Sequence, residues 1–322
     1  MENEVKPLFK YIGGKRWLKN NLEVHFKNVL SRKNFTTYVE PFVGGMGAFL
    51  SLYELLESSG IKKVVLNDIN SHIINFYRII NEEGDFKSSD LIDKMVLFET
   101  EFMSLIPHGT HKLHKLKEKH QIKLNLKDAN WLFLQKRTRF NELLKREEQT
   151  KEEKVEMAAL LLFLQAHCFN GIYRENSKGE YNTPFNWAVK EKTRNQLEKD
   201  IASVKEVFDK FDLVLTNKSA LELEYDENTL YYLDPPYLND EEDNENKYNK
   251  DHFDKKCQLE LIELIKGKNF IYSNHNSDLI REAFQLHNIE YLYEIVKRKN
   301  IVSASVESRN EDKEEILISL NQ

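Results

Sequence analysis

Short apolar runs alternate with stretches of helical apolar spacing near both ends of the chain. The runs that predict strands cover residues 36–40, 63–66, 213–216, 231–233 and 270–275. The stretches that predict helices cover residues 17–30, 48–56, 69–80, 258–266 and 277–286. Strands that alternate with helices in this way are typical of an α/β protein built on an open sheet. Two last apolar runs, 291–296 and 315–320, predict an antiparallel pair at the edge of that sheet.

Residues 85–203 interrupt this alternation. They are mostly helical, with apolar spacing that predicts helices over 91–106, 130–146 and 151–169. The stretch 169–185 predicts a β-hairpin with Ser177-Lys178-Gly179 as its turn. We therefore expect a discontinuous α/β domain made of residues 1–84 and 204–322. The second domain, residues 85–203, is expected to be a mainly helical insertion that carries the hairpin.

The composition fits a globular protein with a substantial core, because 40% of the 322 residues are hydrophobic and 31% are charged. The first four residues include two acids and no apolar segment, so we expect no secretory signal. The longest uncharged apolar run, 157–169, is too short to span a bilayer. Cys168 and Cys257 are far apart and fit no metal spacing, so we expect free thiols in a reducing cytoplasm.

The charge distribution leaves two interpretations open. The formal net charge of −6 argues against an indiscriminate binder of polyanions. Basic residues nevertheless gather in 112–127 and 136–146, whereas acidic residues gather in 240–245 and 311–315. A basic middle region is compatible with nucleic-acid binding and also with charged helix faces that only meet solvent.

The most informative stretch is an apolar run, 230–233, that leads directly into Asp234-Pro235-Pro236-Tyr237. Neither proline has an N–H group for a sheet ladder, so the strand must end at Asp234 in a stiff turn. Ligands of open α/β sheets bind at this carboxyl edge. A planar base with an exocyclic amine suits such a turn, since the amine can donate to Asp234 and Pro235 while the ring stacks on Tyr237. The alternative is a turn that only ends a strand.

A glycine loop, 41–47, follows the first predicted strand and precedes a predicted helix. This arrangement brings a cofactor to the backbone amides at the start of a helix. Asp68, at the end of the second strand, is placed to accept hydrogen bonds from ribose hydroxyls or to cap the helix 69–80. An earlier turn, Gly13-Gly14, permits close backbone approach, but on its own it favours a surface turn over a site.

Three other features bear on function. Asn170 and Arg174 of the hairpin can pair bidentately with adenine and guanine. The charged stretch 238–256 predicts a mobile loop over the site. His275 is a candidate base, but no partner cluster supports it, so a structural polar cap is the preferred interpretation. The roles of Asn274 and His275 stay open.

In their order along the chain, these segments resemble the Dam family of DNA adenine methyltransferases. The likeness is densest at 10–15, 40–49, 67–71, 169–185, 233–237, 273–276 and 309–320. It implies a Rossmann-like S-adenosylmethionine-dependent methyltransferase sheet with an inserted DNA-recognition domain that carries the hairpin. It also implies methyl transfer to the N6 amine of adenine in double-stranded DNA, with no metal.

The resemblance assigns residues to roles by their position. The implied catalytic residues are Asp234, Pro235, Pro236 and Tyr237. The implied cofactor contacts are Tyr11, Lys15, Glu40, Phe42, Gly44, Asp68 and Asp234. The implied DNA contacts are Lys10, Asn170, Ile172, Arg174 and Pro184.

Four positions depart from the family pattern. Tyr11 stands where a tryptophan is frequent, and it can still stack. Met46 stands where glycine is usual, and a left-handed backbone there would cost roughly 1 kcal/mol. Ile172 and Tyr173 differ from the commonest hairpin residues, which leaves the target open between GATC, the commonest family target, and a related short palindrome. The resemblance also allows a partner restriction endonuclease that acts on the same site, as well as a phage or regulatory role.

The expected mechanism is direct transfer from the cofactor. Adenine leaves the duplex, and Asp234 and the Pro235 carbonyl accept both amine hydrogens, so that the nitrogen lone pair is aimed at the methyl group. A related enzyme could act instead on cytosine N4, RNA or protein glutamine, although the aspartate and the hairpin disfavour this. A nicotinamide-dependent dehydrogenase has no use for the turn. A catalytically inactive DNA-binding relative would not need the turn intact.

Overall fold

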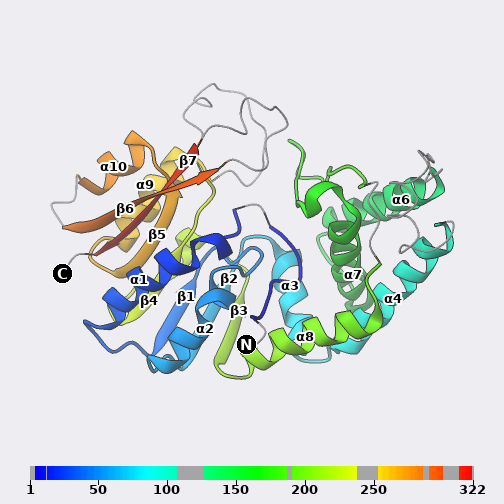
Figure 1. The fold of residues 1–322 in the computed structure, drawn as a ribbon, viewed down its shortest axis with the longest axis horizontal. Helices are drawn as coiled ribbons and strands as arrows, with labels where there is room; N and C mark the ends of the chain where they lie inside the picture. Colours follow the sequence, from blue (N-terminus) through cyan, green and yellow to red (C-terminus); the bar gives the residue numbers. More distant parts are fainter. Residues whose placement is uncertain are drawn as a thin grey trace, which may run out of the picture.

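The computed structural model describes residues 4–11, 13–106, 127–186, 191–237, 253–285, 290–299 and 312–320, and a single sheet organises them (Figure 1). Across these residues the sheet has seven strands in the order β3-β2-β1-β4-β5-β7-β6. Their bounds are β1 Thr37–Glu40, β2 Lys63–Asn67, β3 Asp212–Thr216, β4 Thr229–Leu233, β5 Asn269–His275, β6 Tyr291–Lys299 and β7 Asp312–Leu320. The first five strands in this order are parallel, and β7 and β6 are antiparallel. The predicted α/β sheet with an antiparallel edge pair is therefore confirmed.

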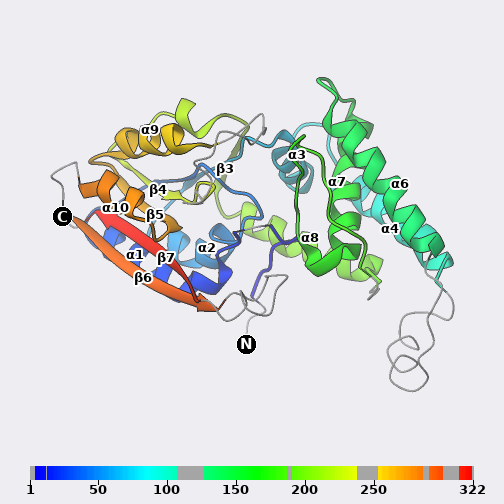
Figure 2. The same ribbon diagram turned by 90° about the horizontal axis from the view of Figure 1, so that it is seen from above.

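Different helices cover the two faces of the sheet, because side chains alternate along each strand. From β4, Leu230 and Tyr232 join one core with α1 (Lys19–Leu30), α2 (Phe49–Ser58) and α3 (Ser71–Ile80). Tyr231 and Leu233 join a second core with α9 (Lys255–Ile265) and α10 (Asp278–Gln285). Figure 2 shows α9 across the sheet from α1 and α2. Every residue of β4 is buried, so the turn that follows this strand starts from the centre of the molecule.

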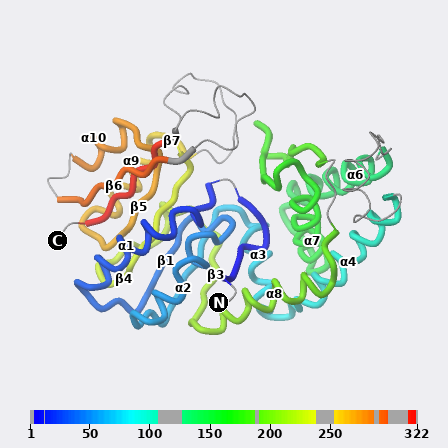
Figure 3. The backbone as a smooth tube through the Cα atoms, in the orientation of Figure 1, coloured from blue at the N-terminus to red at the C-terminus, as the bar shows by residue number. Residues whose placement is uncertain are grey.

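A group of helices extends the first core away from the sheet: α4 (Ser88–Ser104), α6 (Lys127–Leu144) and α7 (Lys151–His167) (Figure 1). Helix α7 contacts α3, α4 and α6. Its residues 157–164 are all buried, as expected for a helix that is apolar on all sides. A reciprocal capping box between Thr150 and Glu153 starts α7. Helix α8 (Arg194–Phe208) then returns the chain to β3, as the tube in Figure 3 shows.

The observed elements agree with the predicted ones except at a few ends. The structure shows α8 as a separate helix, whereas the sequence predicted only a mostly helical region there. Helix α9 begins at Lys255, inside the predicted loop 238–256, because the side chain of Asp254 accepts a hydrogen bond from the N–H of Cys257. Residues 238–252 of that loop, and the lysine-rich residues 112–126, lie outside the described residues. Within the described ranges, no helix is long and apolar enough to cross a membrane.

Candidate active site

The Asp-Pro-Pro-Tyr turn leaves the sheet between two neighbouring parallel strands. β4 pairs with β1 on one side and with β5 on the other. The carboxyl ends of β1 and β5 therefore lie beside Asp234, and the glycine loop 41–47 follows β1 directly. The turn and the glycine loop therefore meet at one edge of the sheet.

The carboxylate of Asp234 is held by two side chains from distant segments. The Nζ atom of Lys15 lies 2.8 Å from both carboxylate oxygens, and Ser273 donates to Oδ1 at 3.0 Å. The Lys15 side chain is 2% exposed and that of Asp234 is 17% exposed. Burial raises the pKa of Asp234, while Lys15 and Ser273 lower it. Because Asp234 is largely buried, water stabilises its charge poorly, and Lys15 favours the ionised carboxylate instead.

A chain of buried amide and hydroxyl groups fixes the second half of the turn. The amide of Gln258 donates to the Pro236 carbonyl at 2.7 Å. Gln258 in turn accepts from the hydroxyl of Tyr272 at 2.6 Å, and Asn274 donates to that hydroxyl at 2.9 Å. The Asn274 oxygen accepts from the backbone N–H of His275 at 2.7 Å. These hydrogen bonds place Asn274 behind the turn, where it has a structural role. The cap role of His275 stays a prediction.

Tyr237 is also anchored, since its hydroxyl donates to Glu315 of β7 at 3.0 Å. The Nζ atom of Lys15 lies 4.8 Å from the centre of the Tyr237 ring. Sequence inspection did not single out Ser273, Gln258 or Glu315. The sequence feature that could have identified them is a polar residue within an apolar strand or helix. All three side chains are buried. Buried polar groups need partners, and here the partners belong to the turn.

The glycine loop is shaped by close backbone approach. Gly44 has φ +44°, and a Cβ atom built on Gly44 would lie 2.9 Å from the ring of Tyr11. A Cβ atom on Gly45 would lie 2.8 Å from the Cβ atom of Tyr11. Met46 has φ +61°, so the strain of roughly 1 kcal/mol foreseen for a left-handed backbone applies. The Met46 side chain is buried in the core beside the loop.

Two more buried acids lie at the same edge of the sheet. Asp68 accepts from the N–H of Gly44 at 2.8 Å and from the N–H of Asn70 at 2.9 Å. Asn70, not Asp68, occupies the N-cap position of α3, so the alternative role of Asp68 as the cap residue is wrong. Glu40 accepts from the hydroxyl of Tyr38 at 2.8 Å. Burial raises the pKa of Asp68 to about 6 and that of Glu40 to about 8.

Two of the three acids at this edge have no basic side chain beside them among the described residues. Over the described residues, neither Glu40 nor Asp68 forms an ion pair with a lysine or arginine. Lys15 balances Asp234 but not the other two acids. The arrangement therefore favours a ligand that carries positive charge. Phe42 borders the loop, with its ring 5.2 Å from that of Phe253.

The segment 169–185 folds back on itself, as predicted, but with sparse pairing. Isolated bridges join Cys168 to Phe185 and Glu175 to Tyr181, and a 3-10 turn, Phe169–Gly171, opens the segment. The backbone N–H of residue 176 bonds the carbonyl of residue 180 at 2.9 Å, and residue 182 bonds residue 174 at 2.9 Å. The turn around 177–179 is thus observed, whereas a continuous two-stranded ladder is not.

Four of the five predicted DNA contacts lie on this segment, and the fifth, Lys10, lies beside it. Asn170, Arg174 and Pro184 are exposed, and Lys10 reaches the Asn170 carbonyl at 3.5 Å. Asn170 itself has φ +59°. Arg174 donates to the side chain of Asn182 at 2.7 Å. Ile172 is half-buried, and its carbonyl accepts from Thr183 at 2.7 Å.

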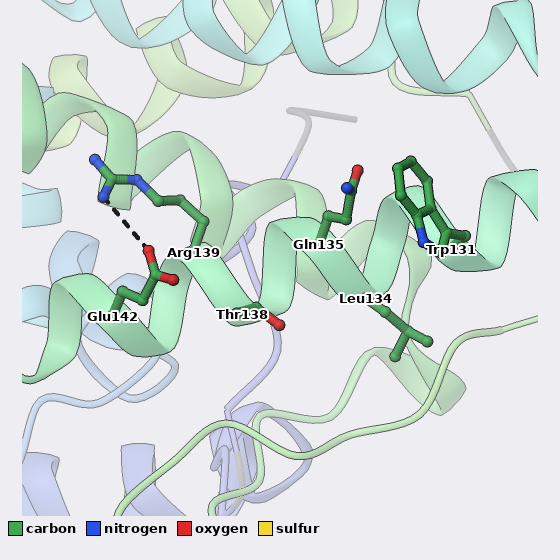
Figure 4. Close-up of a pocket in the computed structure, with 6 residues that line it drawn as sticks. All are labelled: Trp131, Leu134, Gln135, Thr138, Arg139 and Glu142. Atoms are coloured by element: carbon green, nitrogen blue, oxygen red, sulfur yellow. Dashed lines mark ion pairs between the residues drawn. The ribbon is translucent and has the colours of Figure 1, made fainter.

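A surface groove on α6 contains none of the predicted site residues. A groove along α6 is lined by side chains of that one helix (Figure 4): Trp131, Leu134, Gln135, Thr138, Arg139 and Glu142. Cys168 and Cys257 are free thiols, as predicted. In the part of the chain that the structure describes, no three His, Cys, Asp or Glu side chains are grouped to hold a metal ion.

Comparison with known proteins agrees with this geometry. Residues 11–301 match the family model described as D12 class N6 adenine-specific DNA methyltransferase. A Type II methyltransferase of Methanocaldococcus jannaschii, M.MjaIII, is 27% identical over 323 residues, which cover 98% of this chain and 99% of the relative. A DNA adenine methylase of Haemophilus influenzae is 26% identical over 327 residues, which cover 97% and 93%. The chain therefore belongs to the D12 class of N6 adenine-specific DNA methyltransferases.

Proposed function

We propose that this protein transfers the methyl group of S-adenosylmethionine to adenine N6 in double-stranded DNA, within GATC or a related short palindrome. The observation that carries the proposal is the position of Asp234. It lies at the carboxyl end of a central strand, beside the glycine loop, with its carboxylate held by Lys15 and Ser273. Without this carboxylate, the Pro235 carbonyl would be the one proposed acceptor left for the amine.

The residues at the sheet edge fit this cofactor. S-adenosylmethionine supplies an electrophilic methyl group on a positively charged sulfur. Glu40 and Asp68 have no paired lysine or arginine among the described residues, and a bound cation favours their ionised forms. Gly44 lets the ring of Tyr11 lie against the loop, because a Cβ atom at Gly44 would come within 2.9 Å of that ring. We assign cofactor contacts to these residues and to Tyr11, Lys15, Phe42 and Asp234.

The chain's own groups orient the amine. Asp234 and the Pro235 carbonyl accept its two hydrogens, and Tyr237 offers a ring on which the extruded base can stack. Lys15 and Ser273 favour the ionised carboxylate and hold it in place, while Gln258 and Glu315 hold Pro236 and Tyr237. No covalent bond to the protein is needed, because orientation and electrostatic stabilisation suffice for a direct displacement.

We assign DNA recognition to residues 85–203, with 1–84 and 204–322 as the catalytic domain. The exposed side chains on 169–185 and the adjacent Lys10 support this assignment. The base contacts proposed are Lys10, Asn170, Ile172, Arg174 and Pro184. Because M.MjaIII is named a Type II methyltransferase, an endonuclease that cuts the same site is a proposed partner.

The test is expression in a host that lacks adenine methylation, followed by sequencing of its DNA with detection of modified bases. We expect methylated adenine within GATC for the wild type and none for Asp234→Ala. Asp212→Ala, which removes an exposed carboxylate at the start of β3, is the matched control and should stay active. Modified cytosine, or unmodified DNA from a folded wild type that binds no cofactor, would refute the proposal. Methylated adenine at another site would refute only GATC.

A further inference from the structure

Three aromatic rings from three segments are stacked. They belong to Tyr11, which contacts the glycine loop, to Tyr173 of the segment 169–185, and to His72 of α3. The ring of Tyr11 lies 5.4 Å from that of Tyr173, with an angle of 21° between the planes. The ring of Tyr173 also lies 5.5 Å from that of His72 of α3, with an angle of 23° between the planes. Tyr173 is 4% exposed. Burial lowers the pKa of His72 to about 4, so this ring is uncharged at neutral pH.

Hydrogen bonds connect the first ring of this stack to the cofactor edge. Asn70 donates from its side chain to the hydroxyl of Tyr11 at 3.1 Å. The backbone N–H of Asn70 donates to Asp68, which also accepts from Gly44. Tyr11 additionally fills the space above Gly44 and Gly45. The contacts therefore run without a break from Asp68 and the glycine loop to Tyr173.

The other end of the stack belongs to the segment that carries the proposed base contacts. Tyr173 lies between Ile172 and Arg174 in the chain, and its hydroxyl donates to Glu175 at 2.7 Å. Neighbouring side chains of an extended segment point in opposite directions, so Tyr173 is buried while Arg174 is exposed. Tyr173 differs from the commonest family residue at this position, and this difference left the target sequence open. Its side chain is turned away from the exposed surface.

We infer that Tyr173 is a positioning residue that couples cofactor binding to DNA recognition, because it fixes the segment 169–185 against Tyr11 and the glycine loop. This inference rests on the proposed function. Coupling between two sites is reciprocal, so the cofactor should tighten binding of the target duplex by the same factor as the duplex tightens binding of the cofactor. The stack supplies a physical contact through which the two sites affect each other.

The experiment measures the dissociation constant of S-adenosylhomocysteine, the reaction product that has no methyl group to transfer, with and without target duplex, by calorimetry. The ratio of the two constants is the coupling factor. An aromatic pair contact corresponds to a factor of about three to ten, so Tyr173→Leu should reduce the coupling factor by that amount. Tyr173→Phe keeps the ring and should restore it. Phe98→Leu is the matched control, because Phe98 is a similarly buried ring on α4 whose contacts lie within the helical group.

A second variant covers the case in which Tyr173→Leu does not fold. Tyr173→Trp retains an aromatic ring, and its added fluorescence should change when cofactor is added, relative to the wild type. Unchanged coupling in Tyr173→Leu, an equal loss in Phe98→Leu, or unchanged emission from Tyr173→Trp would each overturn the inference. A wild type that binds cofactor and methylates adenine yet shows no coupling would overturn it while leaving the proposed function intact.

Discussion

Replacing Lys15 by methionine removes the positive charge beside Asp234 while keeping most of the side-chain volume. Lys15 is almost fully buried, and its Nζ atom is 2.8 Å from both oxygens of Asp234. At that distance, with an effective dielectric constant of about 20, the gross attraction is about 6 kcal/mol. Desolvation of both groups offsets much of it. An opposite charge this close typically lowers a carboxyl pKa by about 1–3 units, or about 1.4–4 kcal/mol.

The sign of the effect follows from which form of Asp234 can accept a hydrogen bond. Burial raises the pKa of Asp234 and Lys15 lowers it, so Lys15→Met leaves the raising effect opposed only by the hydrogen bond from Ser273. A protonated carboxyl has lost part of its capacity to accept from the amine. Turnover of Lys15→Met should therefore fall at neutral pH and recover as pH rises, with the acid limb of the kcat profile moved up by about 1–3 units.

The assay is the initial rate of methyl transfer to duplex DNA at saturating substrate, from about pH 5.5 to about pH 9.5. Lys27→Met is the matched control, since Lys27 forms an exposed ion pair with Glu23 and should leave the profile unchanged. The double variant Lys15→Met/Asp234→Asn should be inactive at every pH and more stable to urea than Lys15→Met, because no buried charge is left unpaired.

One result would show that Lys15 does not act through Asp234. If Lys15→Met raises the KM for S-adenosylmethionine but leaves the pH profile of kcat in place, Lys15 serves the cofactor directly and not through Asp234.

Three further predictions concern the two binding surfaces. Asp68→Ala should weaken cofactor binding by about 1–3 kcal/mol, the scale of a lost charge-assisted hydrogen bond, and unchanged affinity in calorimetry would contradict the ribose role. Arg174→Ala should relax discrimination at one base pair by about 1–3 kcal/mol, whereas an equal loss of rate on all single-base variants of GATC would make Arg174 a backbone contact. Binding of a cation favours the ionised form of Glu40, whose pKa is raised to about 8, so the cofactor should bind more tightly as pH rises towards 8 and should release protons. Calorimetry in buffers of different ionisation enthalpy measures that release, and a pH-independent affinity in wild type would exclude it.

The order of elements was predictable from the sequence because each strand and helix carries its own periodic signal. The run that ends at Asp234 and the loop after Glu40 identified the edge of the sheet where the site lies. The sheet order was not predictable in the same way, since β4 pairs with β1 across a long stretch of chain. Helix α8 has apolar residues at Leu197, Ile201 and Val204, a helical spacing that the sequence analysis did not use.

The site was predictable only where a residue carries its function in a local motif. Asp234 and Asp68 follow strands and could be placed at their ends. The partners of Asp234 could not, because Lys15 and Ser273 reach it through folding and not through sequence proximity. Tyr173 shows the same limit, because its exposure depends on which side of the segment faces the core.

The position of β4 between β1 and β5 also affects how the protein is made. β1 is an interior strand of the finished sheet, but its neighbour β4 follows only after α4, α6, α7 and α8. During synthesis from the amino terminus, one edge of β1 therefore stays unpaired while the helices leave the ribosome. An open strand edge can pair with another chain. The open edge of β1 therefore keeps the nascent chain prone to aggregation until β4 has been translated. Because Lys15 and Asp234 are 219 positions apart, their ion pair also cannot form until most of the protein has been translated.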